Sequence, residues 1–309
     1  SDAKADSLRQ IKDAFERRGF FYAAGVSALP ADYIASVYDF AAKAHGLSRE
    51  EKARWARPQG TYSGADIGLP EPSYDPGTKS SVRAWDYERM SVREGARDYP
   101  GPDLLPGGFH GFMDTLYTKQ DELAMTLFVA VAEMYGLPSD TFSQHCAGDM
   151  GTIRLLHYPG LNIGEEADSG ISAHTDFEAL TLMHQNAPGL QLMARDTNAW
   201  TDAPVRPGEF IVIVGDVLER FTNGVLRATP HRVLQTPHAR TSIIRFFAMS
   251  PDTMIQPLPK FVTADRPAKY TPVTMARHME TTHHEIDSGL GAWDPETNSS
   301  RTATRTYDQ

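Results

Sequence analysis

The stretch Ile171-Ser-Ala-His174-Thr-Asp176-Phe177 lies within a series of short apolar runs that begins near residue 150. Gly, Pro, Asn and Asp separate these runs, and no long helical pattern comes between them, which is typical of strands joined by turns. The runs cover residues 153–156, 180–182, 190–192, 210–214, 232–234 and 242–247. Many short strands in this arrangement predict a β-sandwich or a jelly roll.

Helical patterns flank this β region. Apolar residues at helical spacing predict helices over residues 8–15, 33–41, 112–135 and 271–286. Ser48 and Glu51 have the spacing of a capping box that starts one more short helix. Residues 56–106 are rich in Gly and Pro and predict loops and short strands. From Asp294 the chain is polar, and we expect its last residues to be mobile.

His174 and Asp176 stand two positions apart in the opening stretch. On a strand such residues share one side, with Cα atoms roughly 6.6 Å apart, so both side chains can reach one ion. His231, within Thr229-Pro-His-Arg-Val233, is a third candidate ligand. Two histidines and one carboxylate on one face of an ion leave its other positions open, as a non-haem Fe(II) oxygenase needs.

Arg240 and Ser242 form a second pair at i, i+2 spacing. An arginine fork can bind a carboxylate through two hydrogen bonds, and a serine hydroxyl can add another donor. Together with the metal triad, the pair indicates a co-substrate that chelates iron at one end and carries an acid at the other. Arg232 and Arg245 are rival anchors.

With these residues the chain resembles the 2-oxoglutarate/Fe(II)-dependent dioxygenases of the isopenicillin N synthase-like group. The family's His-x-Asp, distal His and Arg-x-Ser fall on His174, Asp176, His231, Arg240 and Ser242, with a similar interval of 57 residues between the histidines. Further similar segments cover residues 17–22, 214–219, 222–224, 231–233, 247–251 and 257–259. The resemblance therefore extends over most of the chain.

The resemblance implies a mainly β fold with flanking α-helices, a double-stranded β-helix or jelly-roll barrel, in one dioxygenase domain of residues 1–309. We expect residues 1–149 to be helical and loop-rich, residues 150–255 to form the jelly-roll core with the metal site, and residues 256–309 to form a C-terminal helix and polar tail. The resemblance also implies that the protein uses Fe(II), 2-oxoglutarate and O₂, with ascorbate as a candidate reductant.

More site residues follow from the resemblance. Tyr158 is expected to touch the far carboxylate of 2-oxoglutarate. Leu156 and Ile213 stand where the family often has asparagine, which indicates a changed co-substrate pocket. The predicted substrate contacts are Tyr62, Trp85, Tyr87, Phe177 and Phe247, with Phe221 as a weaker candidate.

Other polar residues have simpler explanations. We expect His278, His283 and His284 to lie on the surface of the charged terminal helix. Asp216 is interpreted as structural, and Arg154 as a support of the sheet with substrate contact as the alternative.

The composition of the chain limits the kinds of partner and the cellular compartment that we expect. The formal net charge of -10 argues against a nucleic-acid partner and disfavours a polyanionic substrate. A single cysteine excludes a disulfide framework and fits a reducing, cytoplasmic compartment. No apolar run reaches the length of a membrane span, and the first residues do not resemble a signal peptide. The oligomeric state stays open.

The expected function is Fe(II)- and 2-oxoglutarate-dependent hydroxylation, desaturation or ring formation on a small organic substrate of secondary metabolism, with succinate and CO₂ as co-products. One alternative is an oxidase or cyclase of the same family that does not use 2-oxoglutarate, with Arg240 and Ser242 holding the substrate's own carboxylate. Another is a non-catalytic jelly-roll protein with structural zinc, although such zinc usually has four protein ligands.

Overall fold

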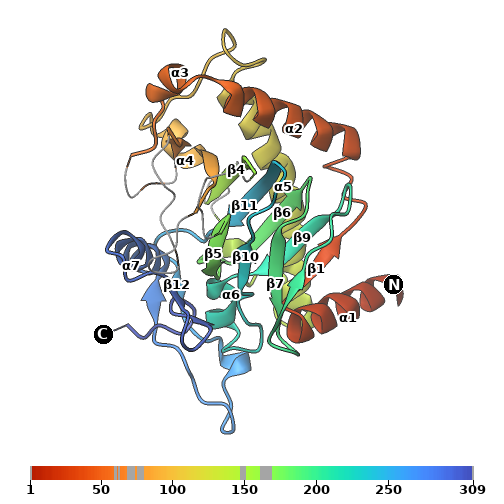
Figure 1. Cartoon of the computed structure of the whole chain (residues 1–309). Coiled ribbons are helices and arrows are strands. Elements are labelled where there is room, and N and C mark those ends of the chain that lie inside the picture. Colours follow the sequence, from red (N-terminus) through yellow and green to blue (C-terminus); the bar gives the residue numbers. More distant parts are fainter. Residues whose placement is uncertain are drawn as a thin grey trace.

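The computed structural model describes residues 2–58, 61, 63–67, 74, 80–146, 151–160 and 169–307. Over these residues two antiparallel sheets carry most of the strands (Figure 1). The larger sheet has the order β1-β9-β6-β11-β4-β3-β2 and the smaller sheet the order β5-β10-β7-β8. The strands of the larger sheet are β1 (Phe20–Ala23), β2 (Gly64–Ala65), β3 (Arg83–Glu88), β4 (Thr152–Tyr158), β6 (Leu180–Gln185), β9 (Phe210–Val214) and β11 (Arg240–Phe247). Those of the smaller sheet are β5 (Ile171–His174), β7 (Leu190–Ala194), β8 (Ala199–Asp202) and β10 (His231–Val233).

Helices cover the outer face of the larger sheet, so the prediction of a mainly β fold with flanking helices is confirmed. The helices are α1 (Asp2–Arg17), α2 (Ala31–Gly46), α3 (Arg49–Ala53), α4 (Arg89–Arg93), α5 (Phe109–Met134), α6 (Asp216–Phe221) and α7 (Met275–Asp287). In Figure 1, α5 runs behind the sheet, and it packs against β6 and β11. The predicted capping box starts α3, where Ser48 and Glu51 bond each other's backbone N–H groups. Within the described residues, no helix is both long enough and apolar enough to cross a membrane.

Strands β6 and β9 of the larger sheet are buried on both faces, which explains why they are mostly apolar runs. Side chains alternate between the faces along each strand. On β11, Ile243 belongs to the core beneath the helices, whereas Ile244 belongs to the core between the two sheets. Leu155 and Leu156 divide in the same way on β4. The inner core is the part of the fold that surrounds the predicted metal ligands.

The C-terminal segment is ordered, contrary to the prediction of a mobile tail from Asp294 onward. It forms a small hairpin of β14 (Trp293–Asp294) and β15 (Ser299–Ser300), and the side chains of Thr302, Ala303 and Tyr307 are buried. A second two-residue ladder joins β12 (Met254–Ile255) to β13 (Val273–Thr274) just before α7. The prediction was wrong because the polar side chains of this segment find partners on α7, far away in the sequence.

Candidate active site

His174, Asp176 and His231 meet at one end of the smaller sheet. β5 ends at His174, β10 begins at His231, and these two residues are direct partners in the β5–β10 ladder. Nε2 of His231 lies 3.5 Å from Oδ1 of Asp176, and Nε2 of His174 lies 3.8 Å from the same oxygen. All three side chains are buried, and their ligand atoms lie within 4.8 Å of one another. Asp176 lies just beyond the end of β5, so the expectation that both residues of the pair sit on one strand was wrong.

The other ring nitrogen of each histidine faces a backbone carbonyl. Nδ1 of His174 lies 2.8 Å from the carbonyl oxygen of Ser172, and Nδ1 of His231 lies 3.0 Å from that of Thr229. Because a carbonyl only accepts, Nδ1 carries the proton and Nε2 presents its lone pair towards Asp176. Burial lowers the pKa of His174 well below its usual value, and the neighbouring His231 adds to this. Both effects favour the neutral form that binds a metal.

Asp176 is held by its surroundings. The hydroxyl of Thr181 donates to Oδ2 of Asp176 at 2.5 Å, while Oδ1 is the oxygen nearest the histidines. The backbone N–H of Asp216, at the start of α6, donates to the carbonyl oxygen of Asp176 at 2.9 Å. Asp216 itself is fully buried and lies outside the ligand cluster, in keeping with the structural role predicted for it. The carboxylate is therefore fixed from both its side chain and its backbone.

Arg240, Ser242 and Tyr158 gather on the inner face of the larger sheet. Arg240 pairs with Tyr158 in the β4–β11 ladder, and its guanidinium carbon lies 4.5 Å from the tyrosine ring centroid. Nη2 of Arg240 donates to Oε1 of Gln185 at 2.9 Å, which orients the fork. Within the described part of the chain, Nη1 of Arg240, Oγ of Ser242 and Oη of Tyr158 are buried without a hydrogen-bond partner. Three buried donors that lack an acceptor are rare in proteins and indicate a place for a polar ligand.

The rival anchors lie elsewhere. Arg245 points to the helical side of the sheet, where its Nη2 lies 3.0 Å from Oδ1 of Asp121 and its guanidinium carbon lies 3.6 Å from the Tyr117 ring centroid. Arg232, on the smaller sheet, stacks over Trp200 at 4.4 Å. Neither arginine lies near the unpartnered donors.

A cavity of about 320 Å³ opens beside the metal triad. Tyr158 lies in its wall, Tyr74 stacks on His174 with ring centroids 4.2 Å apart, and α7 contributes Met275 and Met279. Much of the remaining wall is apolar: Leu156, Ile171, Phe177, Met183, Val233, Ile244, Phe246 and Met249. Such a wall excludes water around the triad and fits a small organic molecule.

Comparisons with known proteins agree with this geometry. The 2OG-Fe(II) oxygenase superfamily matches residues 151–248. The chain is 27% identical over 292 residues to the 2-oxoglutarate-Fe(II) type oxidoreductase hxnY of Emericella nidulans, covering 88% of this chain and 82% of that protein. It is 29% identical to the homoarginine-6-hydroxylase 2-ODD-C23 of Glycine max, with 81% and 80% covered. A crystal structure of a putative 2OG-Fe(II) oxygenase family protein from Caulobacter crescentus superimposes with a TM-score of 0.78 at 26% identity, with 93% of this chain and 96% of that chain covered.

Residues 151–248 form a domain of the 2-oxoglutarate/Fe(II) oxygenase superfamily. The fold agrees as well, because the crystal structure of a full-length Neurospora crassa protein in complex with alpha-KG and thymine superimposes with a TM-score of 0.80 at 21% identity, with 92% of each chain covered. The protein is therefore a jelly-roll oxidoreductase that uses Fe(II), 2-oxoglutarate and O₂ to oxidise a small substrate. These parts of the sequence prediction are confirmed, whereas the isopenicillin N synthase-like grouping stays a prediction.

Some of the residues predicted to contact the substrate lie in the cavity wall, and others lie on the opposite face of the larger sheet. Phe177 lies in the cavity wall, as does Phe246, which the sequence prediction missed. Trp85, Tyr87 and Phe247 lie in the core beneath the helices, so their prediction as pocket residues was wrong. Phe221 belongs to the same outer core, and Tyr62 lies outside the described residues. The spacing of Arg240 and Ser242 could have shown that residue 246, not 247, shares their face.

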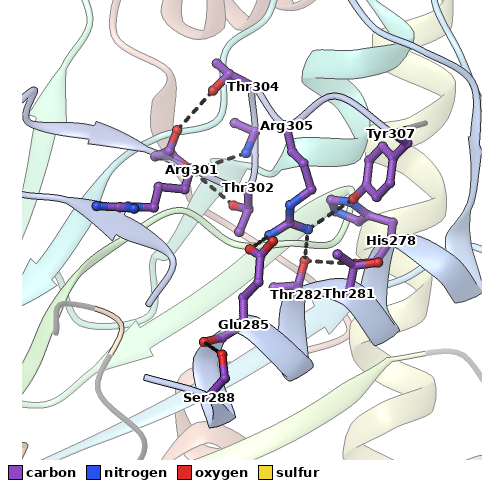
Figure 2. A network of polar contacts seen from close by, with 12 residues as sticks. His278, Thr281, Thr282, Glu285, Ser288, Arg301, Thr302, Thr304, Arg305 and Tyr307 are labelled. Carbon is purple, nitrogen blue, oxygen red and sulfur yellow. Dashed lines mark hydrogen bonds and ion pairs between the residues drawn. The ribbon is translucent and has the colours of Figure 1, made fainter. Parts of the chain in front are cut away.

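The C-terminal segment of the oxygenase braces α7, which forms one wall of the cavity (Figure 2). Arg305 forms an ion pair with Glu285 and donates from Nη1 to Oγ1 of Thr282 at 2.9 Å. The Tyr307 hydroxyl lies 2.7 Å from Nδ1 of His278, whose Nε2 lies 3.1 Å from the backbone carbonyl of Phe177.

His278 thus links the brace to the residue after Asp176. It is fully buried, so its prediction as a surface residue was wrong. His284 is exposed and His283 is partly buried in the cavity wall. Both hydrogen bonds of His278 reach residues far away in the sequence, which explains why its position on a charged helix was misleading.

Proposed function

We propose that His174, Asp176 and His231 hold the Fe(II), and that Arg240, Ser242 and Tyr158 hold the far carboxylate of 2-oxoglutarate. Tyr158 lines the same cavity as the triad and lies against Arg240, and this link between the two groups is the observation that carries the proposal. The substrate would occupy the apolar part of the cavity, beside Phe177 and Phe246. The enzyme would act by hydroxylation, desaturation or ring formation on that substrate.

The residues present fit both groups. Two neutral imidazole nitrogens and one carboxylate form the donor set of non-haem Fe(II) oxygenases. On the co-substrate side, a carboxylate can accept from the unpartnered Nη1 of Arg240 and from the hydroxyls of Ser242 and Tyr158. Leu156 occupies the cavity wall where the family often has asparagine, so the anchor of this chain relies on these three donors.

When bound, iron supplies the oxidation of a substrate C–H bond. For hydroxylation the balance is R–H + 2-oxoglutarate + O₂ → R–OH + succinate + CO₂. The protein's own part is to hold His174 neutral, to orient the co-substrate through Arg240, and to keep water out with apolar walls. Asp176 occupies the position where halogenases of related chemistry have a small residue to admit halide, so we do not expect halogenation.

Anaerobic titration with Fe(II) and 2-oxoglutarate tests the proposal. A weak visible charge-transfer band should need both additions. The variants His174→Ala and His231→Ala should lose the band and the turnover, while circular dichroism shows an intact fold. His284→Ala, an exposed histidine on α7, is the matched control and should behave like the wild type.

Other outcomes would favour the alternatives. Wild-type activity of either triad variant with added Fe(II) would show that the metal lies elsewhere. Turnover without 2-oxoglutarate would favour an oxidase or cyclase that uses only the substrate and O₂. Metal binding without any turnover would favour a structural site.

We infer the cellular setting from charge and cysteine content. The net charge of -10 disfavours a nucleic-acid partner, so the proposed partner is a small molecule. Cys146 is free, which fits the reducing cytoplasm where Fe(II) persists. A fungal relative, named 2-oxoglutarate-dependent dioxygenase frbA, is 31% identical over 210 residues. We propose that the small substrate of this chain belongs to secondary metabolism.

A further inference from the structure

The cavity has a charged end away from the co-substrate anchor. Tyr158, Leu156, Arg154 and Thr152 are successive inward residues of β4, and all of them line the cavity. Four residues of strand separate Tyr158 from Arg154, roughly 13 Å. The strand therefore runs from the proposed 2-oxoglutarate anchor, past the apolar middle of the cavity, to an arginine.

Arg154 is held rigidly in that wall. It is 3% exposed, and it donates to Asp86 twice, from Nε to Oδ1 at 2.7 Å and from Nη2 to Oδ2 at 3.3 Å. Asp86 is its direct partner in the β3–β4 ladder and is fully buried. Nη1 of Arg57 also donates to Asp86, at 3.1 Å. Two guanidinium groups thus share this one carboxylate, and a guanidinium keeps its charge in proteins.

Glu88 is the competing group at this end. It follows Asp86 on the inner face of β3, pairs with Thr152 and lines the cavity. The hydroxyl of Ser91 donates to its Oε2 at 2.7 Å. Burial raises the pKa of Glu88, and the negative charge of Asp86 raises it further. The Glu88 carboxyl therefore carries its negative charge less readily than an exposed glutamate, so it repels a substrate carboxylate less.

The charge balance decides which substrate group fits. Of the described residues in the cavity wall, Arg154 alone is an arginine or lysine. A buried guanidinium gains most from an anion that it can bind through hydrogen bonds. At this end of the cavity an ammonium group would lie beside Arg154, with like-charge repulsion at close range in a poorly hydrated site.

We infer that the substrate of this oxygenase is a small, mainly apolar carboxylic acid, and that Arg154 binds its carboxylate. This inference rests on the proposed function, because the apolar body must reach from Arg154 to the metal triad. Arg154 then determines specificity, while Arg240 serves the co-substrate at the other end. The two arginines lie on neighbouring strands of the same sheet, β4 and β11, so the spacing between the two carboxylates is fixed by the fold.

A matched set of probes tests this inference. We would add 3-phenylpropanoate, 3-phenylpropanamide or 3-phenylpropylamine to the anaerobic Fe(II)–2-oxoglutarate complex of the full chain. Perturbation of the visible band reports binding, and succinate release in air reports stimulated turnover. The carboxylate should bind more tightly than the amide and the amine. Arg154→Gln should weaken the carboxylate on the order of 10- to 100-fold and leave the amide unchanged.

Two further variants separate charge from folding. Asp86 keeps Arg57 as a partner in Arg154→Gln, so the band itself should form with unchanged 2-oxoglutarate affinity and show an intact site. Arg154→Lys should keep part of the carboxylate preference. Glu88→Gln should leave carboxylate binding equal or tighter, because it removes an acid from the same end of the cavity.

Several results would overturn the inference. These are equal binding of all three probes by the wild type, a carboxylate preference that survives Arg154→Gln, and a preference for the amine that Glu88→Gln abolishes. The last result would assign the site to a cationic substrate. If the wild type forms no band with Fe(II) and 2-oxoglutarate, the proposed function itself fails, which is a different outcome from a band that no carboxylate perturbs.

Discussion

Replacing Arg240 by alanine tests how 2-oxoglutarate is anchored. The substitution removes at least the charge-assisted hydrogen bond that Nη1 is placed to make, which contributes about 1.5–3 kcal/mol. At about 1.4 kcal/mol per decade, 2-oxoglutarate should bind roughly 10- to 150-fold more weakly. Ser242→Ala removes a neutral hydrogen bond of about 0.5–1.5 kcal/mol, so the loss should be only about 2- to 12-fold. Arg240→Lys keeps the charge without the fork and should fall between the two.

The assay is an anaerobic titration of 2-oxoglutarate into the Fe(II)-loaded protein, followed by the visible band. Arg232→Ala is the matched control, because Arg232 stacks on Trp200 on the smaller sheet, away from the unpartnered donors. Fe(II) affinity should stay constant throughout, since none of these residues belongs to the triad. An unchanged affinity in Arg240→Ala, together with a loss in Arg232→Ala, would refute the assignment.

Three more predictions follow from the packing. Phe246→Ala should change substrate affinity or the ratio of succinate to product, whereas Phe247→Ala should cost about 3–5 kcal/mol of stability in urea unfolding and leave that ratio unchanged. Burial lowers the pKa of His45 to about 3, below the usual value of 6.5. Below about pH 6.5 the unfolded chain binds a proton at this residue and the folded protein does not, so the free energy of unfolding should fall by up to about 1.4 kcal/mol per pH unit. His45→Gln should reduce this fall, which unfolding measured at pH 5 and pH 7 would show. Arg305→Met should loosen α7, raising substrate KM and uncoupled succinate release without changing Fe(II) affinity; equal kinetics would show that the brace of Figure 2 is not needed.

Much of the architecture could be predicted because it depends on patterns of residues that are close together in the sequence. Short apolar runs separated by turn residues predicted β4, β6, β7, β9 and β11. The capping box predicted that Ser48 is the N-cap residue of a helix, and α3 begins at the next residue, Arg49. The spacing of His174 and Asp176, combined with His231, pointed to a triad that the fold then brings within 4.8 Å. These features depend on a few neighbouring residues or on a family resemblance.

Most of the errors have a different origin, because they depend on partners that are distant in the sequence. Trp85 and Tyr87 look like pocket aromatics, but the register of β3 on β4 turns them towards the helices and turns Asp86 and Glu88 inward. His278 looks exposed on a charged helix, but Tyr307 and the Phe177 carbonyl enclose it. No pattern within one segment reveals such contacts.

Strand register, more than residue type, decides what each position of the larger sheet does. On β11, Arg240 and Ser242 face the inner cavity side, while Arg245 and Phe247 face the helices. A shift by one residue would exchange the faces and carry the proposed co-substrate anchor into the outer core. β4 and β6 pair along β11 on its two sides, and apolar residues are buried on both faces, so a shifted register would bury charged groups in two cores at once. The packing that stabilises the sheet therefore also fixes the distance between Arg240, the proposed anchor, and Arg154 at the far end of the cavity.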